Sequence, residues 1–198
     1  MLKKFFHSLL VGIVVLSMSP NVIAAEQITE PNMTVYEYIQ STEVGQLIAD
    51  TINLGENGSQ SVYVGNGIMF TAEVKTTGSS HSRSSNYQTK TGEASGRFYT
   101  VSNNETVAEY SISAVFEYDG ISYVGLSELP NRSEETVNDN WRLDGLTEEL
   151  SSDTQYIVSG QWTLYHKEGF IWKKYEYNNN THIDIICTPQ GRITYNYK

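Results

Sequence analysis

The sequence contains a single cysteine, Cys187, and only four prolines among its 198 residues. One cysteine excludes an intramolecular disulfide, so the fold must be stable through its own core, which a chain of this length can supply. Positive charge is also scarce, because 13 basic residues face 23 acidic ones and the formal net charge is −10. This acidity argues against nucleic-acid binding and against electrostatic capture by anionic lipid. We therefore expect neither as a partner.

Long hydrophobic runs are missing as well. The longest one, residues 8–18, has about 11 residues, whereas a membrane-spanning helix needs roughly 20. Two lysines precede this run, and the small residues Ala24 and Ala25 follow it. This order is typical of a secretory signal peptide. We predict that residues 1–25 are a signal peptide and that the protein is secreted, with no membrane span after cleavage; an uncleaved anchor is the alternative.

Residues 26–60 show helical rather than strand periodicity. Thr34 and Glu37 have the spacing of a capping box, in which each side chain caps the backbone of the other. Apolar residues then recur at spacings of three and four, at Val44, Leu47, Ile48 and Ile52. The pattern predicts one or two short helices between Thr34 and Asn53, whose apolar side docks on the main domain.

From residue 61 onward, apolar residues recur at every second position. The clearest such stretches are 68–74, 110–118, 156–164, 183–187 and 193–197. Alternate side chains of a strand share a face, so each set can line one buried layer, with Cys187 inward beside Ile183 and Ile185. Turn sequences such as Asp119-Gly120 separate the stretches. Residues 61–198 are therefore predicted to form an antiparallel β-sandwich, immunoglobulin-like or related, with a barrel as the alternative.

Two stretches lack a clear period. Residues 76–94 are rich in Ser, Thr and Gly and predict a long loop or polar edge strands. Residues 129–152 predict a long connection, with a helical turn around 146–150. The acidic part of it, 134–149, is a candidate for an irregular calcium site, because Arg142 occupies a ligand position of the standard EF-hand loop and so excludes that loop.

Three short pieces resemble a known group of proteins. They are 116–120 (FEYDG), 138–143 (NDNWRL) and 183–191 (IDIICTPQG). The chain is similar in them, over roughly residues 68–195, to small secreted β-sandwich domains of unknown function from Gram-positive bacteria. Members of that group often carry a second cysteine soon after the first piece, but residues 121–126 contain none, so that disulfide cannot form. The resemblance implies a β-sandwich and no catalytic residues.

The most site-like spacing is that of His182 and Asp184. Residues two apart on a strand face the same way, so an imidazole and a carboxylate could bind one metal ion, with His166 as a third ligand from a neighbouring strand. No established zinc pattern accompanies them. The alternative is a polar pair facing solvent, and we expect no resident metal or cofactor.

Aromatic residues are concentrated late in the chain. Trp162 shares a face with Val158 and Leu164 and should lie in the core. The ligand-binding candidates are Trp172, Tyr175 and Tyr177, because a flat aromatic strip can stack on sugar rings or on a protein partner. Ordinary packing within the sheet is the alternative, since these residues favour strands.

Three functions remain open on this basis. The favoured one is an exported, non-enzymatic, monomeric binding protein for a glycan or protein ligand at or outside the cell envelope. The second is a secreted metal-dependent hydrolase that uses His166, His182 and Asp184. The third is a membrane-active toxin that uses the Ser- and Thr-rich strands between Thr71 and Ser113.

Overall fold

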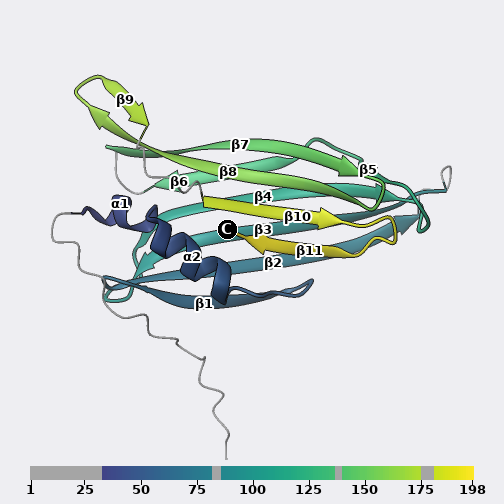
Figure 1. Cartoon of the computed structure of the whole chain (residues 1–198), viewed down its shortest axis with the longest axis horizontal. Helices are drawn as coiled ribbons and strands as arrows, with labels where there is room; N and C mark the ends of the chain where they lie inside the picture. The colour runs from purple at the N-terminus through teal and green to yellow at the C-terminus, as the bar shows by residue number, and fades with distance from the viewer. Residues whose placement is uncertain (1–32, 82–85, 137–139, 175–180) are drawn as a thin grey trace, which may run out of the picture.

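The computed structural model describes residues 33–81, 86–136, 140–174 and 181–198, and the protein is mainly β. Its strands form two antiparallel sheets, sheet A and sheet B, which lie face to face around one hydrophobic core (Figure 1). This confirms the predicted antiparallel, mainly β fold. No helix within the described ranges is long and apolar enough to cross a membrane.

Sheet A contains the first six strands of the chain. They are β1 (Gly58–Gly65), β2 (Ile68–His81), β3 (Gln88–Thr100), β4 (Thr106–Tyr118), β5 (Val124–Leu126) and β6 (Asn131–Thr136). The order β1-β2-β3-β4-β5 follows the chain, and β6 pairs with another part of the β4 edge that β5 uses. The described part of 76–94, expected as a loop or edge strands, instead forms paired ends of β2 and β3 inside the sheet.

Sheet B contains the remaining five strands. They are β7 (Trp141–Ser152), β8 (Gln155–Glu168), β9 (Ile171–Lys174), β10 (Thr181–Cys187) and β11 (Ile193–Tyr197). Their order is β11-β10-β8-β7, and β9 pairs with the end of β8 that lies beyond β10. Sheet A is thus complete before sheet B begins. Immunoglobulin domains distribute consecutive strands between both sheets, so the immunoglobulin-like form of the prediction is not confirmed.

The predicted long connection over 129–152, with a helical turn around 146–150, is wrong. This stretch forms β6 and β7, and β7 pairs with β8 from Trp141 to Ser152. In β7 only Leu143 and Gly145 are buried, and residues 146–152 are exposed or half-buried. A strand with so few buried positions shows no alternation in its sequence. Its backbone hydrogen bonds to β8, which no side-chain pattern reveals, hold it in place.

Two helices precede the strands, as predicted. α1 (Val35–Ile39) begins at the Thr34–Glu37 capping box, and α2 (Thr42–Thr51) is capped by the Ser41 side chain. α2 contacts β1 of sheet A and β11 of sheet B, so the helices bridge the two sheets along one side (Figure 1). Four helix residues are buried in the core, in agreement with the predicted docking: Tyr36, Ile39, Val44 and Ile48.

Large rings lying over glycines fill the core. The Trp162 side chain is fully buried, and its ring centroid lies 4.7 Å from that of Tyr110. A Cβ atom at Gly160 would overlap the Trp162 ring, and one at Gly96 would overlap the Tyr110 ring. Small and large residues therefore complement each other between the sheets, which is how a closely packed interior avoids voids.

The single cysteine points inward, as predicted. Cys187 is fully buried and lies on the same face of β10 as Ile183 and Ile185. Burial raises the pKa of its thiol to about 12, although the nearby Lys90 acts in the opposite direction. The thiol is therefore protonated at neutral pH and has the properties of a small apolar side chain rather than of a nucleophile.

Candidate functional site

The predicted pair His182 and Asp184 comes together on the outer face of sheet B. The Oδ1 atom of Asp184 lies 2.6 Å from His182 Nε2 and accepts a hydrogen bond of 2.6 Å from Ser159 Oγ. Its Oδ2 atom accepts a hydrogen bond of 2.8 Å from Lys198 Nζ. Burial raises the pKa of Asp184, but the hydrogen bonds from His182, Lys198 and Ser159 outweigh it and hold the pKa well below its usual range. Asp184 is therefore a carboxylate at neutral pH.

His166 does not join this pair. The antiparallel register places His182 opposite Gln161, five residues from His166, which is about 16 Å along β8. His166 and Ser159 are an odd number of residues apart on β8, so their side chains lie on opposite faces of the strand. The His166 Nε2 atom lies 3.0 Å from Glu168 Oε1. Among the residues that the structure describes, no three His, Cys, Asp or Glu side chains are grouped to hold a metal ion. The proposed three-ligand site is therefore not assembled.

Ser159, His182 and Asp184 are the residue types of a hydrolytic triad, but their arrangement differs from one. In a triad the imidazole lies between the serine and the carboxylate, so that it can take the serine proton. Here Ser159 and His182 both contact the same oxygen of Asp184. The Ser159 hydroxyl donates to the carboxylate, which orients it without making it a nucleophile. The cluster links β8, β10 and the C-terminal residue.

The Asp184 cluster predicts a loss of stability in acid. Because its pKa is lower in the folded than in the unfolded chain, Asp184 stabilises the fold above the unfolded value of about 3.9 and loses this contribution as the pH falls below it. We expect the loss to be on the order of 2 kcal/mol between pH 5 and pH 2. Urea unfolding across this range should show a shallower decline for Asp184→Asn than for Asp153→Asn, a change in an exposed turn. Equal slopes for the two variants would contradict the prediction.

Of the aromatic candidates, Trp172 lies within the described residues. Tyr175 and Tyr177 lie outside them, in the range 175–180. Trp172 is half-buried on β9. The Arg142 guanidinium lies 5.1 Å and the Lys167 amine 5.8 Å from its ring centroid. These two cations contact the same Trp172 ring that is predicted from the sequence to stack on a ligand. Binding by Trp172, Tyr175 and Tyr177 stays a prediction.

The acidic stretch 134–149 lies mostly in strands. Asp144 is on β7, where its carboxylate lies 3.5 Å from the Arg142 guanidinium. The backbone carbonyl of Asn140 accepts a hydrogen bond from the Lys167 amide. Asp139, the remaining acidic candidate of the calcium hypothesis, lies outside the described residues. The calcium site therefore stays a prediction.

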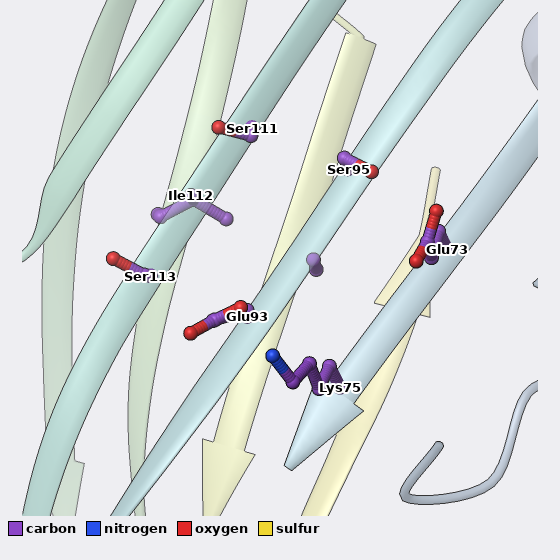
Figure 2. A pocket seen from close by; sticks show the side chains of 8 residues that line it. Glu73, Lys75, Glu93, Ser95, Ser111, Ile112 and Ser113 are labelled. Atoms are coloured by element: carbon purple, nitrogen blue, oxygen red, sulfur yellow. The ribbon is translucent and has the colours of Figure 1, made fainter. Parts of the chain in front are cut away.

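A shallow hollow of about 370 Å³ lies on the outer face of sheet A, across β2, β3 and β4 (Figure 2). Three of the residues that line it, on β3 and β4, are serines, whose short side chains leave the space open. Charged residues flank them, and Lys75 extends from β2 beside its cross-strand neighbour Glu93. The described residues that line it include no aromatic ring: Glu73, Lys75, Glu93, Ala94, Ser95, Ser111, Ile112 and Ser113.

A larger hollow, of about 640 Å³, combines rings with polar groups. We call it the tyrosine groove. Residues 123–129, which contain β5 of sheet A, line one side, and Glu149, Ser151 and Tyr156 of sheet B line the other. The groove is flanked by β5 and by residues 146–152 of β7. On one edge each of these two strands has no pairing strand among the described residues. It lies at the end of the sandwich where β5 is labelled (Figure 1).

Tyrosines and carboxylates form the groove's polar framework. The Tyr123 hydroxyl donates to Glu117 Oε1 at 2.8 Å, and the Tyr156 hydroxyl donates to Glu149 Oε2 at 2.6 Å. The Tyr123 ring also packs against that of Tyr87, with 4.9 Å between centroids, and both side chains remain more than a third exposed. Burial and the bond to Glu149 raise the pKa of Tyr156 to about 12, so this hydroxyl keeps its proton and its partner at physiological pH.

The sequence did not point to this groove. Successive members of Tyr87, Tyr123 and Tyr156 are more than thirty residues apart, and the alternation of 156–164 places Tyr156 on the predicted core face of its strand. That assignment holds in part, because Tyr156 is half-buried against the core while it lines the groove. Tyr123 and Tyr156 line the groove because the edges of the two sheets meet there, and Tyr87 joins them through its contact with the Tyr123 ring.

Comparison with known proteins adds no family. The chain matches no protein-family model, no curated protein and no solved structure. The resemblance to secreted Gram-positive β-sandwich domains stays a prediction. The function is therefore argued from the chemistry of the tyrosine groove.

Proposed function

We propose that this is an exported, non-enzymatic protein that binds a glycan in the tyrosine groove. The observation that carries the proposal is the Tyr87–Tyr123 ring pair, half-exposed beside a hollow lined with carboxylates and hydroxyls. A sugar offers an apolar C–H face and a rim of hydroxyls. The rings can stack on the first, and Glu128, Glu149 and Ser151 can hydrogen-bond the second.

The charge of the groove selects the class of glycan. Among the described residues, its lining includes two carboxylates, Glu128 and Glu149, and no basic side chain. Coulomb repulsion in a partly enclosed groove disfavours uronic acids and sulfated sugars. Neutral sugars avoid this repulsion and still accept and donate hydrogen bonds. We therefore expect neutral glycans to bind more tightly than polyanionic ones.

The size of the groove supports a small ligand. Its volume of about 640 Å³ is in the range of small-molecule sites, which are roughly 300–1,000 Å³. The second candidate ligand is an extended peptide, because an added strand could pair with the edges of β5 and β7 that no described strand occupies. The metal-dependent hydrolase is less well supported, since His166 lies away from His182 and Asp184.

A panel of neutral oligosaccharides tests the proposal. Cello-, manno- and chitohexaose would be compared with polygalacturonate by isothermal titration calorimetry. We expect binding of a neutral member, weakened at least tenfold, or about 1.4 kcal/mol, by Tyr123→Ala. Tyr99→Ala is the matched control, because Tyr99 is a half-buried tyrosine on β3 outside the groove. An unchanged affinity of the Tyr123→Ala protein would contradict the groove assignment, and binding of peptides alone would favour the second candidate.

A further inference from the structure

The hairpin formed by β8 and β9 exposes two apolar side chains at its tip. Phe170 is fully exposed, with 102% of its reference area accessible, and Ile171 is 64% exposed. They follow Gly169, which turns the chain between the two strands. Figure 1 shows this hairpin extending away from the body of the two sheets. A turn so far from the core normally carries polar residues, so the exposed pair calls for an explanation.

Lysines surround this tip although the protein as a whole is acidic. Lys167, Lys173 and Lys174 lie on the hairpin, and Glu168 is its one carboxylate within residues 165–174. Glu168 forms ion pairs with Lys173 and His166. Two net positive charges therefore remain beside Phe170 and Ile171, in a chain whose formal net charge is −10.

The stem of the hairpin is held in place by side chains. The Arg142 guanidinium lies 5.4 Å from the centroid of the Tyr165 ring and 5.1 Å from that of Trp172. Lys167 lies 5.8 Å from the same Trp172 ring. These contacts connect β7, β8 and β9, so the tip is presented on a supported stem. Trp172 follows the exposed pair Phe170 and Ile171 in the chain, and tryptophan is a residue type enriched at membrane–water interfaces.

We propose that the β8–β9 hairpin tip attaches the protein to the surface of a bilayer with anionic headgroups, inserting Phe170 and Ile171. The apolar pair enters the acyl boundary, and Lys167 and Lys174 contact the headgroups. A protein partner is disfavoured because two side chains at a turn offer far less than the roughly 800 Å² per side of a stable interface. The net acidity does not oppose this contact strongly, since charges more than about 8 Å from the surface are screened at physiological salt.

The position of the hairpin suits such an attachment. β8 runs from Tyr156, in the tyrosine groove, to Glu168, at the hairpin, which is about 40 Å of strand. The groove and the tip therefore lie at opposite ends of the long axis (Figure 1). A protein attached through the tip would direct the groove away from the membrane. The two proposals rest on different residues and can fail separately.

Vesicle sedimentation tests the attachment. The purified protein, whose intact mass shows whether residues 1–25 are present, would be mixed with two kinds of vesicle. One kind is pure phosphatidylcholine, and the other contains 30% phosphatidylglycerol. We expect partitioning onto the anionic vesicles to be at least tenfold stronger, to decrease severalfold when the salt is raised, and to decrease at least tenfold in Phe170→Ser/Ile171→Ser. Lys167→Gln/Lys174→Gln should remove the preference for anionic vesicles.

The matched control is Ile121→Ser/Leu129→Ser, which removes two exposed apolar side chains at the opposite end of the sandwich. It should bind vesicles like the unchanged protein, and thermal unfolding should show that both double variants are folded. A blue shift of tryptophan emission on anionic vesicles should accompany binding and be absent in the tip variant. Equal sedimentation with both vesicle types, unchanged binding of the tip variant, or equal loss in the control would each overturn the proposal.

Discussion

Replacing Trp162 by alanine should lower the free energy of unfolding by about 3–5 kcal/mol, the range observed when a large buried aromatic side chain is deleted. Trp162 is fully buried, packs against Tyr110 and lies over Gly160. Its indole nitrogen also donates to Glu134 Oε2 at 3.4 Å, which links β8 to β6 of the other sheet. The substitution therefore leaves a cavity that the two sheets can close only by moving toward each other.

Urea denaturation would measure this effect, and Trp172→Ala supplies a tryptophan control. Trp172 is half-buried on β9 and contacts cations rather than the core, so its loss should cost at most about 1 kcal/mol. A cost below about 1 kcal/mol for Trp162→Ala would mean that the site relaxes around the missing ring.

The second large effect is expected for Gly191→Ala, at about 2–5 kcal/mol. Gly191 has a backbone φ of +73°, a conformation that costs an alanine roughly 1–2 kcal/mol. A Cβ atom at this position would also overlap the Tyr118 ring, where the turn after β10 packs against the end of β4. Overpacking of this kind typically adds 1–3 kcal/mol.

Gly169→Ala separates the two causes. Gly169 has a φ of +63°, and no atom lies within 4 Å of the position that its Cβ would take. Its substitution should therefore cost only the conformational part, about 1 kcal/mol. Thermal or urea unfolding of the two variants gives the comparison. Equal costs would show that the Tyr118 ring moves aside without loss.

Sequence periodicity was sufficient for much of the fold. The alternation around β4, β8 and β10 identified strands whose inner faces are buried, including the face of Cys187 and Trp162. It failed for β7, whose outer half has few buried positions. The hydrophobic pattern of a sequence indicates which residues are buried. A strand held mainly by backbone hydrogen bonds produces no such pattern.

The sequence by itself determined the mainly β fold, the helical segment with its Thr34–Glu37 capping box and the inward face of Cys187, because each depends on spacings within one short stretch. It also brought His182 and Asp184 together, since residues two apart on a strand share a face. Tertiary structure decided that His166 lies elsewhere, that Tyr123 and Tyr156 line one groove, and that Phe170 is exposed on a basic hairpin tip. These features depend on which strands pair and where the sheet edges meet, and such long-range pairings are not encoded in any local period.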